Sequence, residues 1–179
     1  ADAVHALQDR GRPAAVELYH TVLERLRHRQ GYEVSPQSVR RPDGVEVRLD
    51  PTQPLLTLGR LVQEDICLLE HDEAEHVLTG AILCFPAGWT LAQKLDRPLT
   101  HIHTPVASYD ADIARRVQRM FDAIRPEQPL WRANSLLYDD PTLHQPRLEG
   151  VQRPVPVDNS YARSERQCFI RLPKTRAVV

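Results

Sequence analysis

Two histidines separated by a single residue, His101 and His103, are the first feature of the sequence that suggests chemistry. If this segment is a strand, both imidazoles project from one face and can bind iron or zinc together with a carboxylate. The next acidic residue, however, is Asp110. A single neutral histidine on an apolar wall is enough to ligate a haem iron. The remaining interpretation is one exposed histidine and one packed or hydrogen-bonded histidine.

Two further side chains, Trp89 and Lys94, precede the histidine pair in the sequence and could contribute to a cofactor site. Trp89 follows a Pro-Ala-Gly break and can line one side of a flat apolar cofactor, although packing is the more common role of tryptophan. Lys94 can pair with an anion such as a carboxylate, although a lone lysine is more often solvated. Both residues are therefore candidates whose role depends on where the fold places them.

A second group of ionisable residues, Arg163, Glu165 and Arg166, lies near the end of the sequence. Glu165 can fix either arginine, and Arg166 or Arg171 can bind a carboxylate through two parallel hydrogen bonds. The alternative is an edge strand that is protected by its charges. A third candidate, the run from His71 to His76, has the composition of a metal site, but its histidines are five residues apart. Zinc-binding helices use a spacing of four, so we interpret this run as a solvated turn between a helix and a strand.

Composition limits the class of protein. The 179 residues have a net charge of −1 and are 41% hydrophobic, which predicts a single domain over residues 1–179. A nucleic-acid partner is not expected, because a basic excess is missing. A membrane partner is not expected either, because the longest apolar run, Val77–Pro86, is too short to cross a bilayer. Three cysteines without a CxxC motif favour reduced thiols and a cytoplasmic protein.

Known catalytic signatures are also missing, since the sequence has no nucleophile elbow, phosphate loop or dinucleotide fingerprint. The chain begins without methionine and ends at Ala177–Val179, which resembles the start of a strand. We therefore expect a fragment of a longer chain.

Hydrophobic periodicity predicts the elements that must position these residues. Helices are expected over Pro13–Gln30, Thr57–Glu70 and Asp110–Ile124, and residues 89–104 are expected to be irregular or to form a short helix. Strands are expected over Val45–Leu49, Val77–Phe85, Leu130–Tyr138 and Arg166–Leu172. Ala177–Val179 is expected to be the beginning of a further strand. Helices and strands are mixed without strict alternation, which favours an α+β fold around an antiparallel sheet.

Several segments, taken in order, resemble one known family. They are Leu61–Leu69, Phe85–Trp89, Lys94, Pro98–Leu99, Ile102–Val106, Arg132–Asn134, Glu165–Gln167 and Arg171–Thr175. Together they are similar to the haem-dependent oxidative N-demethylase family, alpha-subunit-like. The resemblance implies a PAS-like antiparallel sheet flanked by helices, with haem b bound in its pocket. It also implies a monooxygenase that uses O2 to remove a methyl group from a small secondary amine such as dimethylamine, releasing formaldehyde. Electrons would come from NADPH through reductase subunits that carry FMN and a 2Fe-2S cluster.

The resemblance also assigns roles to individual residues. His103 becomes the ligand of the haem iron, with His101 as the alternative. Glu165 and Arg166 become catalytic residues, with Glu165 as the base or the amine-binding carboxylate. The expected cofactor-binding residues are His103, Trp89, Lys94, Arg132, Asn134 and Gln167.

The sequence departs from the family pattern in four places. Ser135 stands where an aromatic residue is expected, and Asp96 and Arg176 stand where glycines are expected. Ala107-Ser108 follows Pro105-Val106 where the family has a Pro-Gly-like continuation. A glycine is often required by backbone conformation or by close approach of another chain segment. The departures therefore leave open another substrate, or a PAS-like haem-binding or small-ligand-binding module that acts as a sensor without turnover.

Overall fold

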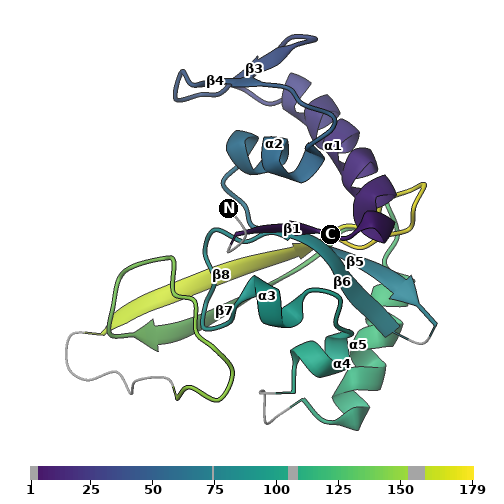
Figure 1. The fold of residues 1–179 in the computed structure, drawn as a ribbon, viewed down its shortest axis with the longest axis vertical. Helices are drawn as coiled ribbons and strands as arrows, with labels where there is room; N and C mark the ends of the chain where they lie inside the picture. The colour runs from purple at the N-terminus through teal and green to yellow at the C-terminus, as the bar shows by residue number, and fades with distance from the viewer. Residues whose placement is uncertain (1–3, 74, 105–108, 153–159) are drawn as a thin grey trace.

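A three-stranded antiparallel sheet lies at the centre of the chain (Figure 1). The structure is a computed structural model that describes residues 4–73, 75–104, 109–152 and 160–179. The strands lie in the order β1-β6-β5, with bounds β1 (His5–Leu7), β6 (Glu75–Ile82) and β5 (Ile66–Asp72). The prediction of an α+β fold with antiparallel pairing is confirmed.

Both faces of this sheet are covered (Figure 1). One face packs against α1 (Arg12–Arg27), α2 (Pro54–Leu61) and a small sheet of β2 (Glu33–Val34), β3 (Ser38–Arg40) and β4 (Glu46–Arg48), and a short helix, η1 (Asp9–Gly11), precedes α1. The other face packs against α3 (Leu91–Lys94), α4 (Leu99–Ile102) and α5 (Ala111–Ala123). Each face therefore has its own apolar cluster, and the helices that carry the candidate site belong to the second cluster.

The expected helix over Thr57–Glu70 is wrong. Helix α2 ends at Leu61, where Val62 adopts an extended backbone, and a strand begins at Ile66. The following apolar residues alternate between the two clusters: Ile66 and Leu68 pack in the first, while Leu69 packs in the second. A strand that is buried on both faces is apolar at almost every position, so its sequence pattern does not separate it from a buried helix.

The interpretation of His71–His76 as a solvated turn between a helix and a strand is confirmed only in part, because residues 71–73 are exposed and turn at Glu73 but join two strands. The two histidines are cross-strand partners in the hairpin of β5 and β6, and only the tip of the hairpin lies between them. His76 is fully buried, and its ring lies 5.1 Å from that of Phe121 on α5. Its Nδ1 lies 2.9 Å from Oε1 of Gln118, which also accepts the backbone N–H of His76. Because this amide oxygen can only accept, Nδ1 carries the proton.

Two of the remaining helical predictions are confirmed with small shifts of their ends. Helix α1 covers most of Pro13–Gln30, and α5 covers Asp110–Ile124 except for one residue at each end. The carboxylate of Asp110 accepts the backbone N–H groups of Asp112 and Ile113, which is the capping interaction that starts α5. The expected strands over Val45–Leu49 and Val77–Phe85 correspond to β4 and β6.

A two-stranded antiparallel ribbon is formed by β7 (Leu130–Tyr138) and β8 (Tyr161–Phe169), and nine residue pairs join the strands. The bounds of β7 are those expected, whereas β8 lies earlier than the predicted Arg166–Leu172. The chain end connects the ribbon to the central sheet. Val178 forms isolated bridges with Leu69 on β5 and with Arg171, which lies two residues after the end of β8. The ribbon is thereby held at the β5 edge of the central sheet.

No helix in the described ranges is long and apolar enough to cross a membrane. The three cysteines, Cys67, Cys84 and Cys168, are free thiols, as expected. Burial raises the pKa of the Cys67 thiol to about 12, so this group stays protonated and poorly nucleophilic near neutral pH.

The buried histidine gives the fold a pH dependence that can be measured. Burial lowers the pKa of His76, so the folded state resists its protonation. The stability that comes from burying His76 in its neutral form is fully present above the ordinary histidine pKa of about 6.5. It is lost as the pH falls through the lowered pKa of His76 in the folded protein. We expect the His76→Gln variant to show a smaller loss of unfolding free energy on acidification, measured by urea denaturation about one unit above and one unit below pH 6.5.

The matched control is His20→Gln, which changes an exposed histidine on α1. This control should keep the wild-type dependence on pH. An unchanged pH dependence in His76→Gln would contradict the assignment.

Candidate functional site

The histidine pair lies on a helix rather than on a strand. Helix α4 begins after Pro98, and His103 occupies its C-terminal cap. Residues two apart on a helix point in different directions, so His101 and His103 do not face a common site. His101 is exposed, whereas His103 is half-buried. The geometry therefore separates the two candidates and gives His103 the enclosed position.

The His103 imidazole is held in one tautomer. Its Nδ1 lies 2.8 Å from the carbonyl oxygen of Leu99, and because a carbonyl only accepts, Nδ1 donates the proton. The lone pair of Nε2 is left available for a ligand, and no described residue hydrogen-bonds to it. The ring stacks on Tyr109 with 4.4 Å between the ring centroids. Tautomer and ring plane are thus both set by neighbouring residues.

The same surroundings keep this imidazole neutral. Burial lowers the pKa of His103, and the positive charges of Arg132 and Lys94 act in the same direction. The hydrogen bond to Leu99 opposes these effects without reversing them. Neutral imidazole is the form that binds a metal ion, so His103 is ready to act as a ligand near neutral pH.

Trp89 packs against the second apolar cluster, and Lys94 lies on α3, whose Leu91 belongs to that cluster. Trp89 is half-buried against this cluster. Lys94 is almost completely buried, and its Nζ donates to the carbonyl oxygen of Ile102 over 2.8 Å and forms an ion pair with Glu149. Its charge is therefore already neutralised within the protein. Glu149 was not singled out from the sequence, where it is an ordinary acidic residue in a loop.

One face of the ribbon carries four of the expected residues. The strand register pairs Arg132 with Gln167 and Asn134 with Glu165, and in antiparallel strands such partners share a face. The Nε of Arg132 donates to Oε1 of Gln167 over 2.7 Å. The positive charge of Arg132 also acts to lower the pKa of His103.

Arg166 is not part of this group. Residues that alternate along a strand point to opposite faces, so Arg166 lies on the other side of the ribbon from Glu165. Its guanidinium lies over the ring of Trp131, 5.1 Å from the centroid, and both side chains are exposed. The structure therefore does not bring the two expected catalytic residues together.

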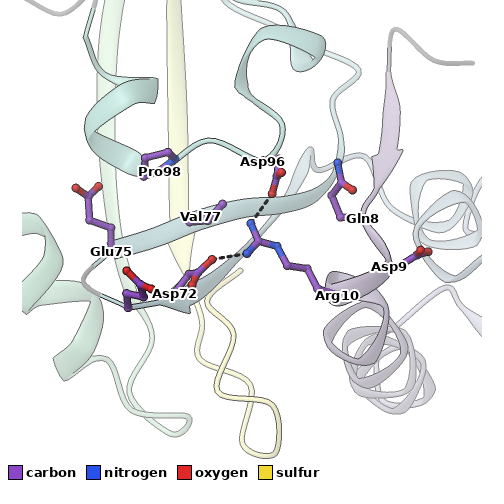
Figure 2. Close-up of a pocket in the computed structure, with 9 residues that line it drawn as sticks. Gln8, Asp9, Arg10, Asp72, Glu75, Val77, Asp96 and Pro98 are labelled. Carbon is purple, nitrogen blue, oxygen red and sulfur yellow. Dashed lines mark hydrogen bonds and ion pairs between the residues drawn. The ribbon is translucent and has the colours of Figure 1, made fainter.

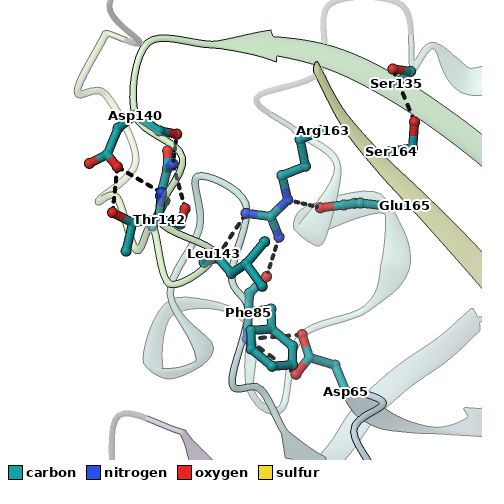
Figure 3. A network of polar contacts seen from close by, with 10 residues as sticks. Asp65, Phe85, Ser135, Asp140, Thr142, Leu143, Arg163, Ser164 and Glu165 are labelled. Carbon is teal, nitrogen blue, oxygen red and sulfur yellow. Dashed lines mark hydrogen bonds and ion pairs between the residues drawn. The ribbon is translucent and has the colours of Figure 1, made fainter. Parts of the chain in front are cut away.

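Arg163 joins the ribbon to the rest of the protein (Figure 3). Its Nε lies 2.9 Å from Oε1 of Glu165, and its side chain is only 11% exposed. Its two terminal nitrogens donate to the carbonyl oxygens of Leu143, over 2.8 Å, and Phe85, over 2.6 Å. Of the two pairings considered for Glu165, the structure shows the one with Arg163. This arginine therefore fixes the Glu165 carboxylate beside the 84–86 turn.

A second carboxylate supports the same turn (Figure 3). Asp65 accepts the backbone N–H groups of Cys84, over 2.6 Å, and Phe85, over 3.2 Å. Burial raises the pKa of Asp65, although these hydrogen bonds and Arg163 act against the rise. Asp65 therefore anchors the backbone whose carbonyl group Arg163 binds.

The departures from the family pattern have a structural meaning. Asp96 and Arg176, which stand where glycines are expected, have φ values of 59° and 65°. This left-handed region is the one that favours glycine. The backbone therefore has the conformation that glycine would favour at both positions. Ser135 lies on the ribbon face opposite the candidate residues, where its Oγ accepts a hydrogen bond from Ser164.

An open pocket of about 840 Å³ is lined by residues 8–10, by the hairpin of β5 and β6 and by residues 96–98 (Figure 2). Arg10 occupies its centre and forms ion pairs with Asp72 and Asp96. Further acidic side chains, Asp9, Glu73 and Glu75, line it. No residue expected from the sequence for the cofactor or for catalysis lies in this pocket, so it does not define the candidate site.

The donor set fits a haem better than a bare metal ion. Within the described residues, no group of three or more His, Cys, Asp and Glu side chains is placed to hold a metal ion. A haem iron needs a single protein ligand, and a neutral imidazole with a free Nε2 meets that need. Arg132, whose positive charge acts on the pKa of His103, is the type of side chain that pairs with a carboxylate such as a haem propionate.

The contacts of Arg163 predict that the stability of the β7–β8 ribbon depends on this side chain. We expect Arg163→Met to lower the unfolding free energy by about 1–3 kcal/mol, because hydrogen bonds from a charged donor are lost. Chemical denaturation measures this change, and hydrogen exchange should show faster exchange in β7 and β8. The matched variant Arg166→Met, on the exposed face, should cost less than about 1 kcal/mol. Equal costs for the two variants would contradict this account.

The amino-acid sequence of the chain matches a known protein family. No curated protein matches the chain. A family model described as haem-dependent oxidative N-demethylase, alpha subunit-like, matches residues 1–179. This description names a haem-dependent oxidoreductase and an alpha subunit, which implies an enzyme of several subunits. Because the match covers the whole chain, the protein belongs to the haem-dependent oxidative N-demethylase family, alpha subunit-like.

Proposed function

We propose that this protein is the haem-binding subunit of a monooxygenase that removes a methyl group from a small secondary amine. The observation that carries the proposal is the His103 imidazole, which is neutral and directs its proton to Leu99 so that Nε2 is free to bind iron. The family membership supports it. In the proposed site, His103 ligates a haem b held in a PAS-like antiparallel sheet.

The residues around His103 have separate roles in this site. Arg132 would pair with a haem propionate, with Gln167 holding the Arg132 side chain in place. Trp89 would line one side of the cofactor, and Asn134 would offer an amide to the substrate or propionate. Lys94 would support the site indirectly, because its ammonium group already binds the carbonyl oxygen of Ile102 and the carboxylate of Glu149.

Glu165 is the proposed binding site for the amine. Small secondary amines carry a positive charge near neutral pH, and a half-buried carboxylate binds the N–H groups of such a cation. Arg163 holds Glu165 in one orientation, so the carboxylate presents its remaining lone pairs in a fixed direction. Transfer of the ammonium proton to this carboxylate would produce the free amine that is oxidised.

Bound haem supplies the oxygen chemistry. Overall, a secondary methylamine, O2, NADPH and a proton give the primary amine, formaldehyde, water and NADP+. The two electrons from NADPH would arrive through partner subunits that carry FMN and a 2Fe-2S cluster. We propose a cytoplasmic location, where NADPH is available.

Reconstitution with haemin tests the proposed ligand. We expect one haem per chain with a Soret band, and a loss of haem affinity in His103→Ala that exceeds the roughly 10–100-fold typical of losing a partner of a metal ligand. Added imidazole should restore the spectrum of this variant. His101→Ala, which changes the exposed histidine, should bind haem like the wild type. A wild-type spectrum in His103→Ala would refute the assignment.

Removing the negative charge of Glu165 tests whether this carboxylate binds the proposed amine substrate. With haem, a reductase and dimethylamine supplied, we expect Glu165→Gln to lower kcat/KM for formaldehyde release by about 100-fold or more. Glu33→Gln, an exposed change on β2, should leave the rate unchanged. Turnover that is insensitive to Glu165→Gln would remove this residue from the mechanism.

A sensor or ligand-binding module is the second candidate function. The ion pair between Glu165 and Arg163 favours it, because a carboxylate that is already paired is a weaker base. In that case haem would bind, but amines would neither shift the Soret band nor stimulate oxygen consumption.

A further inference from the structure

The side chain of Lys94 is an almost fully buried cation, 3% exposed for the whole residue. A buried charge is costly unless it is paired and hydrogen-bonded. Lys94 meets both conditions, because Nζ forms an ion pair with Glu149 and donates to the carbonyl oxygen of Ile102 over 2.8 Å. These partners come from a loop and from α4, so the ammonium group joins two segments that are distant in sequence.

The carbonyl that Lys94 binds belongs to the peptide bond that leads into His103. The last carbonyl groups of a helix have no partner within the helix. In α4, those of Leu99 and His101 accept backbone N–H groups from the residues that follow the helix, and that of Thr100 accepts the hydroxyl of Thr104. Lys94 supplies the missing donor for Ile102. The backbone N–H and Nδ1 of His103 both donate to Leu99, over 3.1 and 2.8 Å. The peptide before His103 and its ring are therefore both fixed.

Glu149 lies at the end of residues 143–149, which run beside the 84–93 segment. This stretch is attached by backbone hydrogen bonds between Gln145 and both Pro86 and Gly88, 2.9–3.0 Å long. The carbonyl of Leu143, at its start, accepts from Arg163. Residues 143–149 thus connect the Arg163–Glu165 pair to the Lys94–Glu149 pair.

We propose that Lys94 and Glu149 are positioning residues that hold the His103 imidazole in place and couple it to residues 143–149 beside Arg163. Neither side chain is assigned a contact with haem or substrate, because the Lys94 ammonium group already binds Glu149 and the carbonyl oxygen of Ile102. The catalytic meaning of this coupling rests on the proposed function, but the effect on His103 itself is a property of the protein without haem. The two parts can therefore be tested separately.

The first test uses the protein without haem. We expect the His103 amide to exchange with solvent about tenfold faster or more in Glu149→Gln, because the ion pair that holds Lys94 on the Ile102 carbonyl is weakened. Lys94→Met should have an equal or larger effect, and the imidazole signals of His103 should move in both variants. Glu149→Gln keeps the lysine, so it remains informative if Lys94→Met does not fold. Glu149→Asp should restore most of the protection.

Lys174→Met and Glu127→Gln are matched controls at exposed positions, and both should exchange like the wild type. If Glu149→Gln also keeps wild-type exchange and imidazole signals at His103, the positioning role is refuted.

The second test uses the protein reconstituted with haem. The rate of haem loss to an acceptor protein should rise about tenfold or more in Glu149→Gln and return toward the wild-type rate in Glu149→Asp. If wild-type protein binds haem through His103 but these variants lose it no faster, the coupling is wrong and the proposed function stands. If the variants disturb His103 and wild-type protein binds no haem, the positioning role stands and the proposed function fails.

Discussion

The hairpin of β5 and β6 is buried on both faces, and the positions of the surrounding elements depend on this constraint. A strand with two apolar faces requires a covering layer on each side. The N-terminal helices α1 and α2 provide one layer, and α3, α4 and α5 provide the other (Figure 1). Leu91 and Leu99 anchor α3 and α4 in the second cluster. Helix α4 is too short to be stable alone, so its packing against the hairpin is what places His103.

Charged side chains then assemble the site from separate pieces. Arg163 connects the ribbon to the 84–86 turn, and Lys94 connects α3 to the end of α4 and to Glu149. Each of these cations has little exposure and several acceptors. An ion pair of this kind adds little net stability, but breaking it leaves an unpaired charge, so it selects one arrangement over others. The segment 143–149 carries contacts to both cations, and this links the two ends of the candidate site.

The two left-handed positions show how the chain departs from the pattern of its family while the backbone keeps its shape. Asp96 adopts a positive φ, which short polar side chains tolerate better than most, and its carboxylate pairs with Arg10. Arg176 adopts a similar φ, with its carbonyl bound by Arg171 and its side chain exposed. Neither side chain lies in the candidate site, so these departures do not alter the residues around His103.

The sequence by itself determined the α+β class, helices α1 and α5, strand β7 and the family, because amphipathic periodicity and ordered motifs are local properties. It also singled out His103, Arg132, Asn134, Glu165 and Gln167 as candidates. It did not distinguish β5 from a helix, because burial on both faces removes the alternation of apolar and polar residues. Only the tertiary structure decided that His101 and His103 point apart, that Arg166 lies across the ribbon from Glu165, and that Glu149 neutralises Lys94. These outcomes depend on strand register and on contacts between residues up to 55 positions apart, which no local pattern specifies.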